Sequence, residues 1–94
     1  MFYTYILLCA DNLYYVGFTQ NLESRLKEHN EGTLGAAYTF IRRPVTLVYS
    51  ESFDTQLKAI MRERQLKGWS HAKKEALING NLDSLKTLSK RTVK

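Results

Sequence analysis

Two short segments near the start of the chain, residues 2–8 and 13–18, are rich in aromatic and aliphatic side chains. Residues of these types favour β-strands. Asp11 and Asn12 lie between the segments, and both residue types favour turns. The pattern therefore predicts a β-hairpin, in which successive side chains of each strand point to opposite faces.

Tyrosines occupy both strands of the predicted hairpin. Alternation places Tyr5 on one face of the first strand, and it gives Tyr15 and Gly17 a common face of the second strand. The hairpin can bring Tyr5 and Tyr15 to the same side of a sheet, although several registers are compatible with the sequence.

A helical pattern follows over residues 22–30. Asn21 is a favourable N-cap, and Gly32 is a stop signal beyond the end of the pattern. At about 100° per residue, Arg25 and His29 lie on the flank of the apolar stripe of this helix. We therefore expect both side chains to point along the sheet surface toward the tyrosines.

The middle of the chain predicts a loop over residues 33–44 and a third strand over residues 45–52. Alternation along this strand places Tyr49 on the same face as Leu47. The third strand is the last one that the pattern predicts.

Helical patterns fill the rest of the chain. Asp54 is expected to cap a helix over residues 55–67 that ends at Gly68, and Ser70 is expected to cap a further helix that extends to Ile78. A last short helix and a basic tail are expected within residues 81–94, after a first unit of residues 1–80. The stripe expected to be buried on the helix over residues 55–67 consists of Leu57, Ile60, Met61 and the stem of Arg64, with Glu63 at its edge.

This order of elements predicts an α+β fold with one small sheet covered by helices. A chain of 94 residues with 44% hydrophobic residues is expected to form one modest core. The 14 Lys and Arg residues against 9 Asp and Glu residues give a net charge of +5, which favours a polyanionic partner such as nucleic acid.

Cys9 is the only cysteine, which excludes an intrachain disulfide and a zinc site built from several cysteines. No segment approaches the roughly 20 consecutive apolar residues that a membrane span requires. We therefore expect a cytoplasmic, soluble protein without a disulfide partner.

Four side chains suit the hydrolysis of a phosphodiester. Such a reaction requires an attacking water, a group that takes its proton, and cations near the phosphate oxygens. Tyr5 and Tyr15 can bind the water, Arg25 can contact two phosphate oxygens, and Glu63 can hold one hard divalent cation. Each of these residues is also common in an ordinary strand or helix, so their combination carries the hypothesis.

Several motifs together resemble the GIY-YIG nuclease superfamily, and more closely its small single-domain UPF0213 branch, over about residues 2–79. The motifs begin with Tyr3-Thr4-Tyr5, Tyr15-Val16-Gly17, Arg25, His29 and Glu63. They continue with Tyr38-Thr39, Arg42-Arg43-Pro44, Leu47-Val48-Tyr49, Leu66-Lys67-Gly68-Trp69-Ser70, Lys73-Lys74 and Leu77-Ile78.

The resemblance implies a three-stranded antiparallel sheet flanked by helices and the hydrolysis of DNA with one Mg²⁺ or Mn²⁺ ion. It implies that Tyr5 acts on the water as general base and that Tyr15 supports the water or the phosphate. Arg25 would stabilise the transition state, His29 would lie near the nucleophile or the leaving group, and Glu63 would bind the metal.

We also expect a surface that contacts nucleic acid. Tyr3 and Thr4 stand where the first motif of the superfamily has Gly and Ile. Many members also carry a late asparagine in the site, and this chain has no secure counterpart, since Asn79 and Asn81 also suit the end of a helix. The leading interpretation is a monomeric, structure-selective endonuclease that repairs or processes DNA. One alternative is a module that binds DNA or RNA without turnover, and another is a protein-interaction adaptor. The expected contact residues are Gly17, Tyr38, Thr39, Arg42, Arg43, Lys73 and Lys74.

Overall fold

A three-stranded antiparallel sheet with the strand order β2-β1-β3 forms the centre of the computed structural model, which describes residues 1–31 and 42–80. The predicted last helix and the division after residue 80 concern residues 81–94, which lie outside the described range. The described elements are β1 (Phe2–Leu8), β2 (Tyr14–Thr19), α1 (Leu22–Glu31), β3 (Thr46–Phe53), α3 (Gln56–Lys67) and α4 (His71–Ile78).

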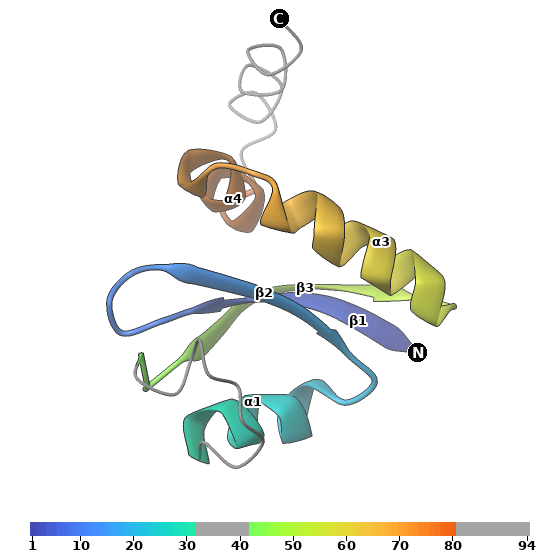
Figure 1. Cartoon of the computed structure of the whole chain (residues 1–94), viewed down its shortest axis with the longest axis horizontal. Coiled ribbons are helices and arrows are strands. Elements are labelled where there is room, and N and C mark those ends of the chain that lie inside the picture. Colours follow the sequence, from blue (N-terminus) through green and yellow to red (C-terminus); the bar gives the residue numbers. More distant parts are fainter. Residues whose placement is uncertain (32–41, 81–94) are drawn as a thin grey trace, which may run out of the picture.

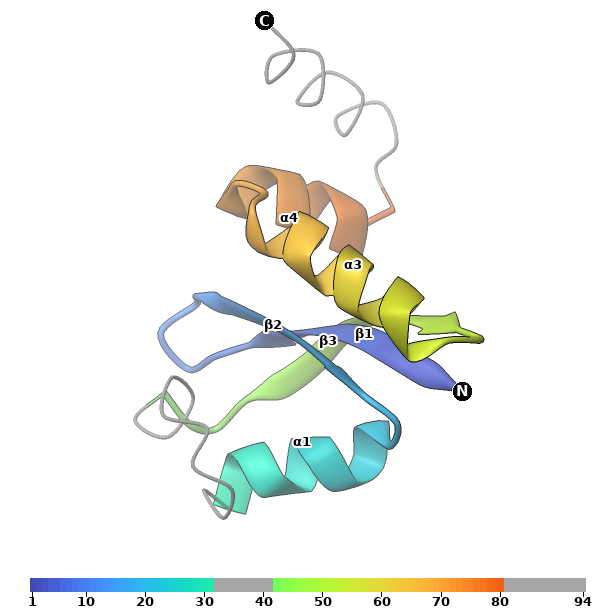
Figure 2. The same ribbon diagram turned by 45° about the vertical axis from the view of Figure 1, so that its right-hand side comes forward.

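Helices cover both faces of the sheet. Helix α1 lies on one face, and α3 and α4 lie on the other, as two views of the ribbon show (Figure 1 and Figure 2). The predicted α+β fold, with a small three-stranded antiparallel sheet flanked by helices, is confirmed.

The hairpin forms where the sequence predicts it. The backbone N–H of Leu13 donates to the side chain of Asp11 at 3.2 Å, and Asn12 adopts a positive φ of 67°, which asparagine tolerates. This turn sets the register, so Tyr5 lies opposite Gly17 and Leu7 lies opposite Tyr15. Tyr5 and Tyr15 therefore share a face, as predicted.

Each face of the sheet carries its own hydrophobic cluster, because successive strand residues point to opposite sides. The cluster on the α1 face contains Tyr5, Leu7, Cys9 and Val45, with Tyr15, Leu22, Leu26 and Leu47 packed against it. The cluster on the α3 face contains Ile6, Val16 and Leu66, with Tyr14, Val48, Tyr49, Trp69, Leu77 and Ile78 packed against it.

A β-bulge in β3 overturns the predicted alternation of that strand. Leu7 pairs with Leu47 but Ile6 pairs with Tyr49, so Val48 is an additional residue between the two pairs. One additional residue reverses the faces of all residues beyond it. Tyr49 therefore packs in the cluster of the α3 face, and the prediction that it shares a face with Leu47 was wrong.

The buried side of α3 also differs from the prediction. Its buried residues are Ala59 and Leu66, whereas the side chains of Leu57 and Met61 are exposed. The buried hydroxyl of Thr4 in β1 donates to the carbonyl oxygen of Ala59 at 2.7 Å, and this bond selects the side of the helix that meets the sheet. A pattern within the helix alone carries no information about this contact.

The predicted N-cap is confirmed for α4 and is wrong for α3. Ser70 caps α4, and its side chain accepts a hydrogen bond from the backbone N–H of Lys73. Helix α3 is capped by Thr55, which accepts from Lys58, and Asp54 instead forms an ion pair with Lys58 at 2.9 Å. The expected cap at Asp54 was therefore wrong by one residue.

The side of α3 that faces the sheet can be tested with two leucines of the same helix. Leu66 has no exposed surface, and Leu57 is 65% exposed. We expect Leu66→Ala to lower the free energy of unfolding by about 2–5 kcal/mol, because it leaves a cavity in the core. The matched control Leu57→Ala should change it by less than about 0.5 kcal/mol. Urea unfolding measures both, and equal effects would contradict this packing.

Candidate active site

The hydroxyl of Tyr5 is the meeting point of the predicted site residues on the α1 face. Tyr5 is 2% exposed, and its oxygen lies 3.0 Å from Nε2 of His29. Nε of Arg25 donates to the same oxygen at 3.4 Å. The Tyr15 ring lies beside both rings, with its centroid 6.4 Å from that of Tyr5 and 5.0 Å from that of His29.

Helix α1 positions Arg25 and His29 because its first turn and its apolar side are both fixed. The side chain of Asn21 accepts a hydrogen bond from the backbone N–H of Ser24 at 3.0 Å, which confirms the predicted N-cap. Leu22 and Leu26 pack on the sheet. Residues four apart lie on one side of a helix, so Arg25 and His29 meet Tyr5 together.

Burial determines the charge of this group. Removal from water raises the pKa of Tyr5 to about 12, with Tyr15 and Glu63 adding to the rise and the hydrogen bond from Arg25 opposing it. Removal from water also lowers the pKa of His29 below its usual value, and the neighbouring Arg25 lowers it further. Near neutral pH the phenol and the imidazole are therefore both uncharged.

The direction of the hydrogen bond between Tyr5 and His29 follows from these charges. The Tyr5 oxygen accepts a hydrogen bond from Arg25, and a neutral imidazole has one nitrogen without a proton. The Tyr5 hydroxyl can therefore donate its proton to Nε2 of His29. This arrangement leaves the Tyr5 oxygen able to receive a proton from a water as its own proton moves to the imidazole.

Gly17 leaves the space that the Tyr5 side chain occupies. A Cβ atom on Gly17 would lie 2.5 Å from the Tyr5 oxygen and 2.7 Å from the ring carbon that carries it. The end of the phenol thus lies against Gly17 of β2, which is an edge strand of the sheet. This close approach explains the glycine in the second motif, and it directs the Tyr5 hydroxyl toward the edge where the two faces meet.

Glu63 lies on α3, on the opposite face of the sheet from α1 (Figure 1). Its side chain is 13% exposed and forms an ion pair with Lys67 at 3.3 Å. It is near enough to Tyr5 to contribute to the raised pKa of the phenol. The structure therefore groups Tyr5, Tyr15, Arg25 and His29 closely, whereas Glu63 approaches them from the other helical layer.

One carboxylate can anchor a divalent cation in this arrangement. No group of three or more His, Cys, Asp or Glu side chains suited to a metal occurs within residues 1–31 and 42–80. Mg²⁺ binds through one or two carboxylates, substrate phosphates and waters, and so it requires no such group. Glu63 fits this mode, because its partner Lys67 is half exposed and can turn away into solvent.

The predicted contact residues are distributed over both faces. Near the α1 face, Arg42 forms an ion pair with Asp11 at 2.9 Å, and Arg43 donates to the carbonyl oxygen of Asn30 at 3.0 Å. Tyr38 and Thr39 lie outside the described residues.

The two predicted lysines are on α4, on the other side of the sheet. Lys73 is 8% exposed, and its Nζ lies 4.2 Å from the centre of the Trp69 ring. Burial lowers the pKa of Lys74. Trp69 packs against the core of the α3 face. Lys73 is thus engaged inside the protein, and Lys74 is the more accessible of the pair.

Asn30 and Thr4 position elements of the site, although the sequence pattern did not predict these roles. The side chain of Asn30 donates to the carbonyl oxygen of Val45 at 3.1 Å and accepts from its N–H at 2.8 Å, which ties the end of α1 to the approach to β3. Thr4 fixes α3, and through it Glu63. A polar residue within an apolar strand was the signal for Thr4, whereas Asn30 resembled any residue at a helix end.

No helix of the described residues is long and apolar enough to cross a membrane. Cys9 is a buried free cysteine.

Comparison with known proteins identifies relatives of this chain. The family model described as the GIY-YIG catalytic domain matches residues 1–76. A UPF0213 protein of Syntrophus aciditrophicus is 49% identical over 79 residues, which cover 84% of this chain and 91% of the relative. A UPF0213 protein of Natronomonas pharaonis is 49% identical over 76 residues, which cover 81% and 88%.

Two solution NMR structures are similar in fold. The structure of a UPF0213 protein from Bacillus halodurans has 38% sequence identity and a TM-score of 0.55, and the match covers 86% of each chain. The structure of a protein from E. faecalis has 41% identity and a TM-score of 0.57, and the match covers 83% of this chain and 82% of the other.

The space above Gly17 can be tested by adding one methyl group. We expect Gly17→Ala to lower the free energy of unfolding by about 1–3 kcal/mol, because the new Cβ displaces the Tyr5 ring. Gly68→Ala is the matched control, since the nearest atom to its Cβ would lie 3.5 Å away and its φ is −80°. This control should stay within about 0.5 kcal/mol in urea unfolding. Similar losses in both variants would refute the close approach.

The lowered pKa of His29 makes stability depend on pH in a defined direction. As the pH falls, the unfolded chain protonates this histidine near pH 6.5, before the folded chain does. The contribution of neutral His29 is complete above about pH 6.5 and is lost as the pH falls through the folded pKa.

We expect His29→Gln to lose less stability than the parent between about pH 8 and about pH 5, because groups other than His29 titrate alike in both proteins. Urea unfolding at both pH values measures this difference. Equal losses in the parent and the variant would show that His29 keeps its usual pKa in the fold.

Proposed function

We propose, since the chain belongs to the GIY-YIG family of nuclease domains, that it is a metal-dependent endonuclease that hydrolyses phosphodiester bonds of DNA. The observation that carries this proposal is the Tyr5 hydroxyl, buried between the imidazole of His29 and the guanidinium of Arg25. These groups supply a path for a proton and a cation for a phosphate, which are the two requirements that side chains can meet alone.

The proton path begins at the attacking water. A phenol with a pKa of about 12 is not ionised near neutral pH, so it cannot act as a phenolate that is already formed. The Tyr5 oxygen instead receives the proton of the water while its own proton passes to Nε2 of His29. Neutral His29 is suited to this step, because its lowered pKa keeps it unprotonated at the start.

Arg25 and Tyr15 act on the phosphate side of the reaction. The Arg25 guanidinium points at the Tyr5 oxygen and also forms a long ion pair with Glu28 at 3.8 Å. Both of these side chains are 34% exposed, so the pair is weak and a phosphate can replace Glu28. Tyr15 holds the rings of Tyr5 and His29 in place and supports the bound water or phosphate.

Glu63 would hold one Mg²⁺ or Mn²⁺ ion in place of its ion pair with Lys67. When bound, the ion neutralises charge on the phosphate as that charge grows in the transition state. Thr4 keeps the helix that carries Glu63 in place.

The substrate is proposed to be recognised by shape. Base readout requires an element that enters a groove with several base-reading side chains, and each described helix instead packs against the small sheet. Arg42 and Arg43, with the undescribed Tyr38 and Thr39, would contact the backbone. We therefore propose a monomeric, cytoplasmic, structure-selective nuclease that processes or repairs DNA.

A second candidate is a nucleic-acid-binding module without turnover. The ion pair between Glu63 and Lys67 favours it, because the proposed metal ligand already has a partner. Such a module would bind DNA or RNA through its net charge of +5, and its affinity would fall steeply with salt.

The test is cleavage of branched, nicked, single-stranded and duplex DNA at low salt with Mg²⁺ or Mn²⁺. We expect Glu63→Gln and Tyr5→Phe each to lower the rate by about 100-fold or more, since the first removes the proposed metal ligand and the second removes the hydroxyl that relays the proton. Glu23→Gln is the control, because this exposed carboxylate lies in the first turn of α1, away from Tyr5.

The binding-module candidate predicts a different result. DNA would bind to the parent with a salt-dependent affinity and remain intact under all conditions, and Glu63→Gln would bind equally well or more tightly. If the parent protein neither binds nor cleaves DNA, both candidate functions are refuted.

A further inference from the structure

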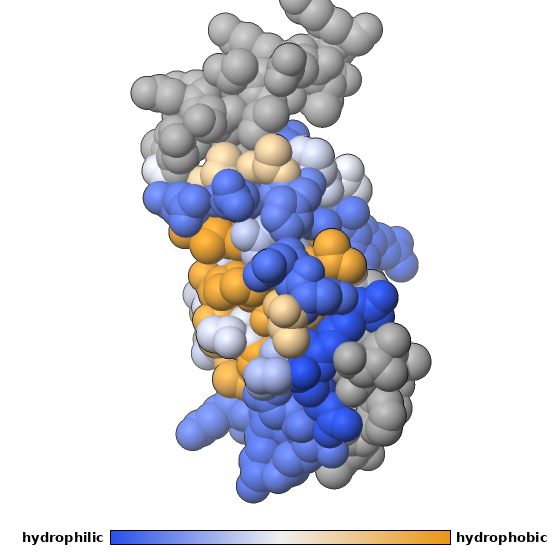
Figure 3. All heavy atoms as spheres, turned by 90° about the vertical axis from the view of Figure 1, so that its left-hand side faces the viewer, coloured by the Kyte–Doolittle hydropathy of each residue, from blue (hydrophilic) through white to orange (hydrophobic). Residues whose placement is uncertain are grey.

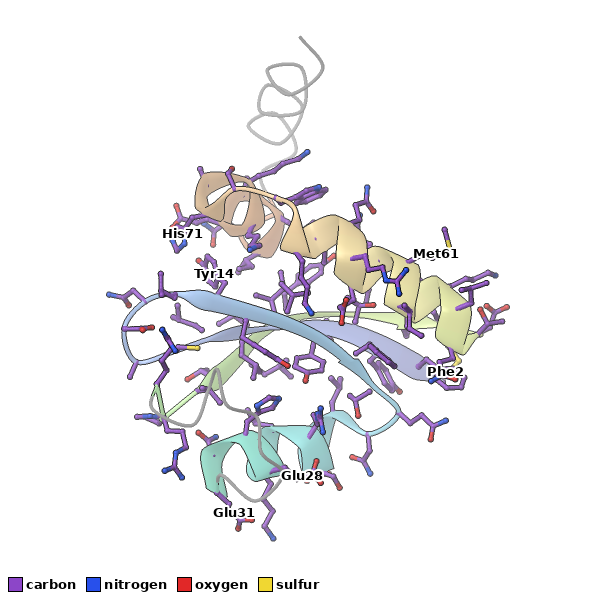
Figure 4. All side chains as sticks on the ribbon, in the orientation of Figure 1. Phe2, Tyr14, Glu28, Glu31, Met61 and His71 are labelled. Carbon is purple, nitrogen blue, oxygen red and sulfur yellow. The ribbon has the colours of Figure 1, made fainter. Side chains whose placement is uncertain are left out.

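A stacked pair of rings lies on the other face of β2 from Tyr5, Arg25 and His29. The rings of Tyr14 and His71 have centroids 4.5 Å apart and an angle of 21° between their planes. Tyr14 comes from β2 and His71 from the start of α4, and the two side chains point toward each other in Figure 4. Nothing in the proposed catalytic mechanism uses this pair.

The pair is anchored on one side and open on the other. Tyr14 is half-buried and packs against the cluster of the α3 face, so its ring is held in place. His71 is exposed, although one face of its ring is covered by Tyr14. The accessible part of the stack is therefore on His71, and a third flat ring would lie on the side of the imidazole away from Tyr14.

The position of the pair relates it to the active site. Tyr14 directly precedes Tyr15 in β2, and neighbouring strand residues point to opposite faces. Because β2 is an edge strand, both faces are reached from the same edge. A nucleic-acid strand that lies along this edge passes the Tyr5 hydroxyl on one side and the stacked pair on the other.

The surroundings of the pair suit a base better than a phosphate. Burial raises the pKa of Tyr14, and the nearby carboxylate of Glu75 raises this pKa further, so a negative charge that repels a phosphate lies near the pair. Leu13 is 44% exposed beside Tyr14. Figure 3 shows apolar surface at the level of the sheet on the side where α4 and the hairpin turn lie.

Trp69, which is the larger ring, does not offer the same surface. The guanidinium of Arg62 lies 5.2 Å from its centre and Nζ of Lys73 lies 4.2 Å from it. Both cations occupy positions that a base would need. Tyr14 and His71 thus form the aromatic stack of the described residues that presents an accessible ring.

We propose that Tyr14 and His71 form a stacking platform for one unpaired nucleobase of the strand that is bound at the active site. This inference rests on the proposed action on nucleic acid and adds a second contact to it. Every base has a flat face, so the platform accepts all four bases and selects unpaired strands over intact duplex. It thereby supplies a physical basis for structure selectivity.

The test measures the affinity for DNA that carries a single-stranded segment, by fluorescence anisotropy in the presence of EDTA so that the DNA stays intact. We expect His71→Ala to weaken binding by about 5-fold to 100-fold, the range that stacking of one base contributes. His71→Phe retains a ring and should stay within about twofold of the parent. His71→Lys retains a basic side chain but no ring, and it should bind as weakly as His71→Ala.

A second measurement locates the base. A series of DNAs, each with one abasic nucleotide, should show one position at which the parent loses affinity and His71→Ala does not. The slope of affinity against salt should be the same in the parent and in His71→Ala, because stacking releases no counterions.

Three results would overturn the platform. The parent and His71→Ala could bind DNA with a single-stranded segment equally well, or His71→Ala could weaken binding to intact duplex by the same factor. In the third result, His71→Lys would bind as tightly as the parent. These results leave the proposed nuclease untouched if the parent cleaves DNA with metal. If the parent neither binds nor cleaves any DNA, the proposed function fails first. His71 is exposed, and a thermal unfolding midpoint that matches the parent verifies that each variant is folded.

Discussion

The buried hydroxyl of Tyr5 is the constraint on which the arrangement of this small protein depends. A hydroxyl that is 2% exposed is costly unless it has partners, and here the partners are His29 and Arg25 of α1. Meeting them requires Gly17, because any larger residue occupies the space of the phenol. The sheet register, the direction of α1 and the glycine of β2 therefore serve one contact, and the same contact is the centre of the proposed site.

Alternation along β1 links this contact to the other layer. Tyr5 faces α1, while its neighbours Thr4 and Ile6 face α3, where Thr4 donates to Ala59. A strand of seven residues thus contacts both helices and places them relative to each other. In a three-stranded sheet each outer strand is an edge, and β2 is the edge strand against which the end of the Tyr5 ring lies. Groups from the two faces can therefore act on one substrate there.

Local patterns in the sequence were sufficient for the hairpin, for α1 and for the grouping of Tyr5 with His29, because turn residues, caps and helical spacing act within a few residues. Contacts between distant segments were not predictable in this way. The bulge at Val48 reversed the face of Tyr49, and Thr4 turned α3 so that Leu57 became exposed. The place of Glu63 depends on that same rotation of α3, which a pattern within the helix does not specify.

The charges of the site indicate the kind of substrate it can bind. Tyr5 and His29 are held neutral by burial, so Arg25 carries the positive charge of this group. Its carboxylate partner Glu28 is 3.8 Å away and partly exposed, and such a pair contributes little in water. An anion that enters beside Tyr5 therefore gains a bidentate partner in Arg25 and displaces only this weak pair. A cationic ligand would gain no such partner and would meet the guanidinium, so the group favours an anion such as a phosphodiester.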